Sequence, residues 1–261
     1  MNIVLIVETF IAFVIAVTLH EAAHTAAAAM LGDRSPVAAG RLSLAPTRQM
    51  AAVGTIVAIF YSFSAAGGLG WGRPISVDAK RLRVGPNFGL ILVALAGPLL
   101  NLALGIAIAF GLAFLPGYAA LGSRVTACLP AQGGFLTVNA LHGLDLQGCL
   151  SVAQPAYLLR IEQFLFTFAV TNIVLAILNI IPLYPLDGYR VLFALLPAPQ
   201  AISFRRAEPY MEIILLVIFF LVPWLLGILG IGFDPGRILI GLAQSLAGGF
   251  APHILNFYVS L

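Results

Sequence analysis

Residues 3–31 read IVLIVETFIAFVIAVTLHEAAHTAAAAML. The stretch is longer than the roughly 20 apolar residues that a helix needs to cross the hydrocarbon core of a bilayer. Ala, Val, Leu, Ile and Phe make up most of it, and His20, Glu21 and His24 form a polar cluster in its second half. We therefore predict a membrane-spanning helix that carries ionisable groups inside the membrane.

The composition of the whole chain is that of an integral membrane protein. Of its 261 residues, 61% are hydrophobic and only 9% are charged, whereas about 25% of the residues in soluble domains are charged. The net charge is +3, and the basic residues lie in loops between apolar runs. They therefore indicate membrane topology, and we expect a lipid bilayer and no nucleic acid as the surroundings of the chain.

Five apolar segments are long enough to cross a bilayer. They are about Ile3–Leu31, Phe88–Leu115, Ile161–Pro182, Tyr210–Ile231 and Ile238–Tyr258. A shorter sixth segment, Met50–Ala66, is followed by the glycine-rich sequence GGLGWGRP at 67–74. We therefore expect an all-α, polytopic transmembrane bundle with about five spanning helices plus a re-entrant or short sixth segment. It forms a single domain over residues 1–261.

Loop charges distinguish the two possible placements of Met50–Ala66. Basic residues precede it (Arg34, Arg41 and Arg48) and follow it (Arg73, Lys80, Arg81 and Arg83). The positive-inside rule places both flanks in the cytoplasm, which a re-entrant hairpin allows and a full crossing does not. The hairpin also puts residues 20–24 and Asp187 in the same, cytoplasmic half of a multi-pass membrane protein.

The HEAAH sequence at 20–24 is typical of a zinc site. His20 and His24 are four residues apart, so both imidazoles project from one helical face toward one possible metal ion. Glu21 between them can act on a water molecule without being a ligand, as in H-E-x-x-H zinc proteases. The alternative is a polar cluster that only joins helices, although ionisable groups inside membranes are usually functional because they are costly to bury.

A catalytic zinc ion usually has three protein ligands and one open position. His142 and His253 are poor candidates for the third ligand, because the first lies in the long loop and the second near the end of the last helix. Asp187–Gly188 follows two prolines at the inner end of a span and is expected to form a turn. A turn alone would explain this dipeptide equally well, but the predicted topology brings Asp187 to the level of the histidines.

Several motifs resemble the site-2 protease family of intramembrane zinc metalloproteases. They are HEAAH at 20–24, GRLSLAP at 40–46, GWGRPISV at 70–77, AGPLLN at 96–101 and LNIIPLYPLDGYR at 178–190. The resemblance covers about residues 17–195, followed by additional helices at about 210–258. It implies one zinc ion per chain on His20, His24 and Asp187, with Glu21 as the catalytic acid and base. It also implies that Asn179 helps to hold the substrate or the oxyanion.

Two features depart from the family pattern. Tyr189 stands where a second glycine is common, which is expected to narrow the site or alter substrate fit. The chain also resembles the short members that contain the protease core without a PDZ or CBS domain. Two further features stay open: Cys128 and Cys149 form a disulfide or remain thiols, and Asn101 makes a polar contact near the metal or packs between helices.

These observations predict a zinc endopeptidase that cleaves transmembrane segments of membrane proteins. Two alternatives belong to other classes. A zinc or proton-coupled transporter also places histidine and acidic residues in membrane helices, but it is expected to contain inverted repeats, which are not evident here. A non-catalytic metal-binding scaffold is the second alternative, although such a protein would not need Glu21.

Overall fold

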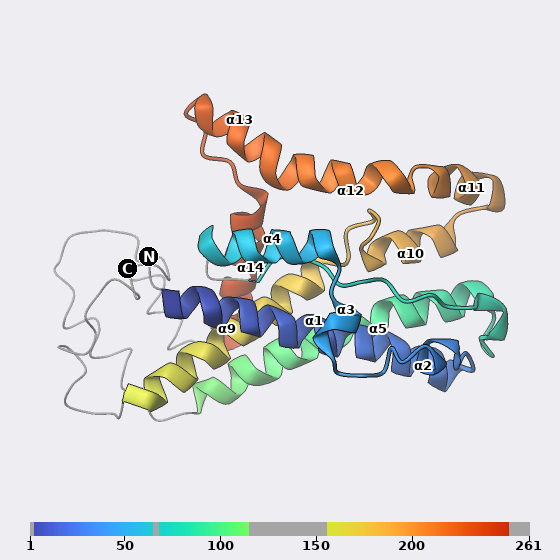
Figure 1. The fold of residues 1–261 in the computed structure, drawn as a ribbon, viewed down its shortest axis with the longest axis horizontal. Helices are drawn as coiled ribbons and strands as arrows, with labels where there is room; N and C mark the ends of the chain where they lie inside the picture. Colours follow the sequence, from blue (N-terminus) through green and yellow to red (C-terminus); the bar gives the residue numbers. More distant parts are fainter. Residues whose placement is uncertain (1–2, 65–67, 115–155, 251–261) are drawn as a thin grey trace.

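Three long helices pack against one another in the lower half of the view of the computed structural model, which describes residues 3–64, 68–114 and 156–250 (Figure 1). They are α1 (Ile3–Leu31), α5 (Pro86–Ala113) and α9 (Ala156–Leu178). Each of the three contacts the other two. The backbone N–H and C=O groups of a helix pair within that helix, which is the arrangement that a bilayer requires of a spanning segment.

One face of α1 turns toward α5 and α9. Phe13, Val17, His20, His24 and Ala28 are all buried. They follow one another at intervals of three or four residues, so they share one side of the helix. The face that carries the histidines is therefore the face that packs into the bundle.

Two glycines allow α5 to approach its neighbours closely. A methyl group on Gly97 would lie 2.6 Å from His24 Cε1 of α1, and one on Gly105 would lie 2.9 Å from the Ala169 carbonyl oxygen of α9. Small residues commonly allow such close packing between membrane helices. Gly97 thus places α5 directly against the histidine pair.

The chain folds back on itself after α1, where the short helices α2 (Ser35–Ala38) and α3 (Pro46–Gln49) precede α4 (Ala52–Ser64). Helix α4 has 13 residues, which is about 20 Å of helix and too short to cross the hydrocarbon core. Met50 before it forms an antiparallel bridge with Gly72 after it, and the Arg73 N–H donates to the Gln49 carbonyl at 2.7 Å. The two ends of the segment therefore meet, as in the predicted hairpin.

The remaining helices follow the turn after α9. In chain order they are α10 (Asp187–Leu195), α11 (Ala198–Arg206), α12 (Glu208–Leu216), the π-helical turn η2 (Val217–Leu221), α13 (Val222–Ile228) and α14 (Pro235–Phe250). Helices α12 and α13 continue each other through η2 (Figure 1). Tyr61 of α4 donates to the Phe219 carbonyl of η2 at 3.0 Å, so this long helix lies against the hairpin. Helix α14 packs on α9 and α5.

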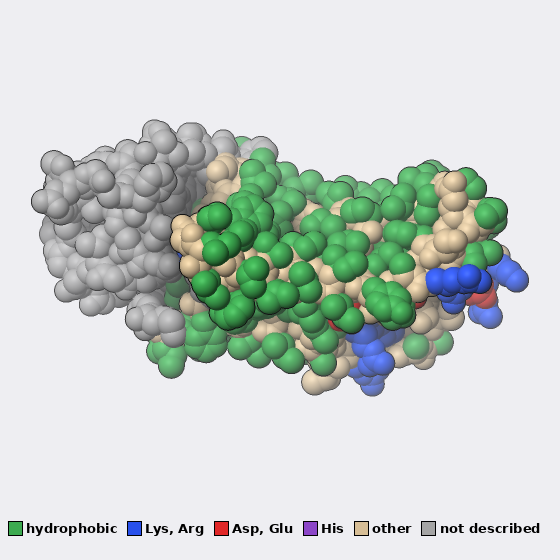
Figure 2. Space-filling model, turned by 90° about the horizontal axis from the view of Figure 1, so that it is seen from above, with side chains coloured by type: hydrophobic (Ala, Val, Ile, Leu, Met, Phe, Trp, Pro, Cys, Tyr) green, Lys and Arg blue, Asp and Glu red, His purple; other side chains and the backbone are tan. Residues whose placement is uncertain are grey.

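The surface of the described residues is that of a membrane protein. Among the coloured side chains of the face shown in Figure 2, apolar ones predominate, and Lys and Arg gather in only a few places. Within the described part of the chain, three helical stretches are long and apolar enough to span a bilayer: Ile3–Leu31, Pro86–Leu112 and Glu208–Ile228. The predicted all-α, polytopic membrane bundle is confirmed. The number of crossings stays a prediction, because Leu115 and residues 251–258 lie outside the described part of the chain.

Candidate active site

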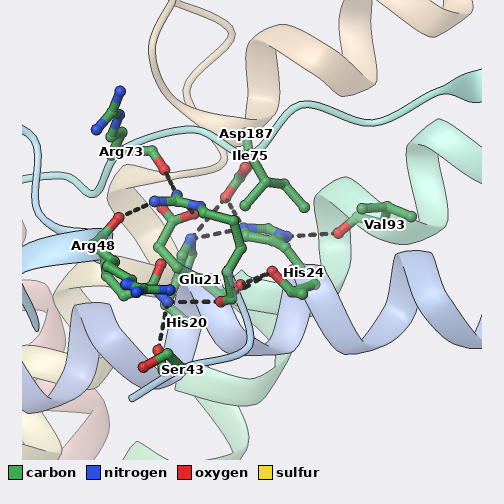
Figure 3. A network of polar contacts seen from close by, with 12 residues as sticks. His20, Glu21, His24, Ser43, Arg48, Arg73, Ile75, Val93 and Asp187 are labelled. Atoms are coloured by element: carbon green, nitrogen blue, oxygen red, sulfur yellow. Dashed lines mark hydrogen bonds and ion pairs between the residues drawn. The ribbon is translucent and has the colours of Figure 1, made fainter. Parts of the chain in front are cut away.

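Helix α1 presents two histidines side by side on its buried face (Figure 3). The ring centroids of His20 and His24 are 4.6 Å apart, and their Nε2 atoms are 3.0 Å apart. Both side chains are buried. The spacing of four residues therefore brings the two Nε2 atoms to one point inside the bundle.

Asp187 reaches the same point from the first turn of α10, directly after the segment that links α9 to α10. The Gly188 N–H donates to the Asn179 carbonyl at 2.7 Å and thereby closes that segment. A methyl group on Gly188 would lie 2.5 Å from the Ile181 carbonyl oxygen, so only glycine fits there. The sequence predicts a turn at Asp187–Gly188, but these two residues begin helix α10 instead. Gly188, packed against the segment that precedes this helix, directs Asp187 to α1.

Three potential ligand atoms converge in this arrangement. Asp187 Oδ2 lies 2.9 Å from His20 Nε2 and 3.1 Å from His24 Nε2. Tetrahedral zinc binds nitrogen and oxygen ligands at about 2.0–2.2 Å, which puts neighbouring ligand atoms roughly 3.3 Å apart. The separations in the structure are close to that value. His20, His24 and Asp187 also form a group that can hold a metal ion by residue type and distance.

A hydrogen bond through His24 Nδ1 favours the binding of a cation at His24 Nε2, on the opposite side of the ring. His24 Nδ1 donates to the Val93 carbonyl at 2.7 Å, so its Nε2 offers a lone pair toward His20 and Asp187. Histidine ligands of zinc are commonly oriented by such a bond through their other nitrogen. Electron-rich atoms that converge in an apolar interior are stabilised by a divalent cation between them, and two imidazoles with one carboxylate are typical zinc ligands.

Glu21 lies beside this group and has a different set of neighbours. Its Oε2 is 3.6 Å from Arg41 Nη2, and both side chains are largely buried. A methyl group on Gly72 would lie 2.9 Å from Glu21 Cδ and Cγ and closer still to Oε1, so the Gly72 backbone rests against the carboxylate. Glu21 is therefore held between Arg41 and the extended segment that follows the α4 hairpin.

Arg41 belongs to the site, although the sequence indicates it only as a basic loop residue that marks membrane topology. Its guanidinium donates to the carbonyls of Arg48 and Arg73 and so joins the two segments that flank α4. Gln49 Nε2 donates in turn to the Arg41 carbonyl at 2.7 Å. The GRLSLAP motif at 40–46, which contains Arg41, is the sequence signal that indicates this residue.

The surroundings of Arg41 lower the pKa of its guanidinium from the usual arginine value. Burial lowers the pKa of the Arg41 guanidinium, the Glu21 carboxylate raises it, and the positive charges of Arg73 and Arg190 lower it further. Arg190 of α10 also donates to the Ile75 carbonyl and so ties the Asp187 helix to the extended segment. The two halves of the site are therefore linked by arginine side chains as well as by the metal-binding group.

Two asparagines are buried near these elements. The side-chain Nδ2 of Asn179 donates to the Leu175 carbonyl at 2.9 Å, and its backbone carbonyl accepts from the Gly188 N–H. Asn179 therefore stabilises the segment that leads to Asp187. A role toward substrate stays a prediction. Both side-chain polar atoms of Asn101 lack a hydrogen-bond partner among the described residues. Both roles considered for Asn101, a polar contact near the metal and packing between helices, stay predictions.

Tyr189 packs toward the later helices. Its hydroxyl donates to Glu208 of α12, and its ring stacks on Phe204 of α11 with centroids 4.8 Å apart. The side chain that replaces the common glycine thus joins α10 to α11 and α12. Four other residues considered from the sequence, His142, His253, Cys128 and Cys149, lie outside the described residues.

Comparisons with known proteins agree with this geometry. A family model described as peptidase family M50 matches residues 8–222. The chain is 30% identical over 209 residues to a Bacillus subtilis (strain 168) protein named "Putative zinc metalloprotease YwhC", which covers 80% of this chain and 78% of that protein. No solved structure matches significantly.

Proposed function

Because the chain belongs to peptidase family M50, the site-2 protease family of membrane zinc metalloproteases, we propose that His20, His24 and Asp187 hold its zinc ion, one per chain. The observation that carries this assignment is the convergence of three buried ligand atoms from residues up to 167 positions apart. Bound zinc supplies Lewis-acid chemistry, which polarises a peptide carbonyl and eases the deprotonation of water.

Glu21 is the acid and base of the reaction. Its carboxylate takes a proton from the attacking water and returns a proton to the leaving nitrogen. The positive charge of Arg41, 3.6 Å from Oε2, favours the ionised carboxylate. Asn179 assists at the substrate: its amide nitrogen has two N–H groups, and only one of them is used by the Leu175 carbonyl.

The substrate is a transmembrane segment of another membrane protein. His20, Glu21 and His24 are buried on α1, and many apolar side chains are exposed on the outside of the bundle. A peptide that reaches them comes from the bilayer, and its helix unwinds locally because helical carbonyls are hydrogen-bonded. The transporter and the non-catalytic scaffold are not favoured, since the chain belongs to a protease family.

The protease forms one domain over residues 1–261, with its active site toward the cytoplasmic half of the bilayer. The basic residues support this orientation. Arg41, Arg48 and Arg73 meet around the paired ends of the α4 hairpin, and positively charged loops are typical of the cytoplasmic side.

Cleavage can be tested with the purified chain in liposomes. The probes are single-span helices carried between two soluble tags, and the cut is mapped by mass spectrometry. We expect about one zinc ion per chain and cleavage within the apolar segment of the probe. A zinc chelator should prevent this cleavage, and added zinc should restore it. Failure to cut any membrane helix of a large panel, or zinc flux without a peptide product, would contradict the proposal.

The orientation can be tested by cysteine labelling in intact cells. Thr47→Cys and Ser76→Cys are introduced singly after Cys128 and Cys149 are changed to serine. Because residues 50 and 72 are paired, we expect both new cysteines to resist an impermeant thiol reagent until the membrane is opened. Restoring Cys128 alone provides the control, which we expect to react from outside. Labelling of Ser76→Cys from outside would overturn the proposed orientation.

A further inference from the structure

Positive charge surrounds the catalytic carboxylate. Four arginines, defined here as the arginine rim, lie on the elements that meet at Glu21: Arg41, Arg48, Arg73 and Arg190. Among the described residues, Glu21 is the acidic residue that forms an ion pair with the arginine rim, through Arg41. The rim therefore carries more positive charge than Glu21 can balance.

Three members of the arginine rim already have structural partners. Arg41 pairs with Glu21 and donates to two carbonyls. Arg48 Nη1 donates to the Gly40 carbonyl at 3.3 Å, and Arg190 donates to the Ile75 carbonyl. These three guanidiniums hold the loop, the hairpin and α10 together.

Arg73 differs from the other three. Its N–H donates to the Gln49 carbonyl at 2.7 Å and its carbonyl accepts from Arg41, so its backbone is fixed on both sides. Its side chain is exposed, and within the described part of the chain its guanidinium makes no hydrogen bond or ion pair. Figure 3 shows this side chain pointing away from the network that its backbone joins. The backbone of Arg73 is thus held in place, while its guanidinium carries a positive charge that no acidic group of the described residues pairs with.

The position of Arg73 relates this charge to the substrate. It directly follows Gly72, whose backbone rests against the Glu21 carboxylate. A scissile bond that Glu21 serves must lie close to the same place. An extended peptide advances about 3.3 Å per residue, so a residue one to three positions from that bond is roughly 3–10 Å away, within range of a long arginine side chain.

We propose that Arg73 selects substrates that carry an acidic side chain one to three positions from the scissile bond, on the flank that leaves the membrane beside Arg73. This specificity rests on the protease function proposed above. A carboxylate is the partner that a guanidinium binds best through paired N–H donors. Complementary charge at the edge of a binding site mainly determines which partner is accepted.

A peptide is a better partner for this guanidinium than a lipid headgroup. Other exposed basic residues, Lys80, Arg81 and Arg83, follow at the end of the same segment, where they can face headgroups without contact to the site. Arg73 is separated from them by Ile75, which is buried. Its place next to Gly72 makes it a neighbour of the catalytic carboxylate.

A charge exchange between enzyme and substrate tests the proposal. The probe is a tagged helix that the wild-type protein cuts, with each of the three positions on either side of the mapped bond changed in turn to Asp, Ser or Lys. At one or more positions, we expect wild type to cut the Asp probe about 10-fold more efficiently (kcat/KM) than the Lys probe, and R73E to reverse that preference. Cutting of the Ser probe is expected to change least.

Lys80→Glu is the matched control, because it makes the same charge change at an exposed position of the same segment. It is expected to keep the wild-type preference. An unchanged Asp-to-Lys ratio in R73E overturns the proposal. So does an equal loss with all three probes, which would point to a lipid contact or to loop packing. In either case a cut Ser probe leaves the protease function intact, whereas that function fails if wild type cuts no probe at all.

Discussion

Glu21→Gln should abolish most cleavage while leaving zinc in place. The substitution keeps the size of the side chain and removes the carboxylate that accepts a proton from water. General-base catalysis typically contributes about 10²–10⁴-fold, and we expect a loss of that size in kcat. Zinc content should stay near one per chain, because the three converging ligand atoms belong to His20, His24 and Asp187. The measurements are single-turnover cleavage of a liposome-embedded helix and zinc analysis of the same sample.

Glu212→Gln on α12 provides the matched control for this prediction. It is the same chemical change on a helix outside the site, and it should leave cleavage near the wild-type rate. A Glu21→Gln protein that cuts at the wild-type rate would refute the role of Glu21 as general base. A Glu21→Gln protein that has lost its zinc would instead indicate that Glu21 is a ligand or supports one.

The parts of the site that could be predicted from the sequence depend on short-range rules. Helical periodicity places His20 and His24 on one face because residues four apart lie one above the other. Loop charge predicted the hairpin around α4, whose ends are paired at Met50 and Gly72. Spacing along the chain does not place Asp187 near the histidines. That prediction also requires the membrane topology, which follows from the loop charges on both sides of α4.

The remaining parts depend on contacts between distant segments, which periodicity does not describe. Arg41 lies 20 residues beyond Glu21 and looks like an ordinary loop charge until the chain folds back. Its partners are the carbonyls of Arg48 and Arg73, and a backbone carbonyl has no signature in the sequence. The role of Gly97 cannot be predicted from the sequence for the same reason. Glycine is common in membrane helices, and the sequence does not show which residues of α1 Gly97 contacts.

The end of α9 shows a similar limit. The apolar run predicted a helix as far as Pro182, whereas the structure ends it at Leu178. A proline disfavours helical geometry in the residue before it, and the Asn179 carbonyl is bonded to Gly188 rather than to the next helical turn. The long-range requirement to direct Asp187 toward α1 therefore shortens the helix before the proline is reached.

Gly97→Ala should remove zinc from the protein although alanine favours the helical conformation. The added methyl group would lie 2.6 Å from His24 Cε1 and 2.7 Å from His20 Cε1. His24 cannot easily move away, since its Nδ1 is bonded to the Val93 carbonyl on the same helix as Gly97. We expect a zinc content far below one per chain and cleavage lowered by about 100-fold or more, because misplacement of a catalytic group by about 1 Å has that effect.

Two further glycines make the prediction specific to the metal. A methyl group on Gly111, also on α5, would meet no atom within 4 Å, so Gly111→Ala should keep both zinc and activity. A methyl group on Gly72 would displace Glu21 and not the histidines, so Gly72→Ala should lower cleavage while it keeps zinc. Zinc analysis and cleavage of the three proteins, each checked for a folded state by its thermal unfolding, separate these outcomes. A zinc-replete and active Gly97→Ala protein would show that α5 does not hold the histidine pair as tightly as the structure places it.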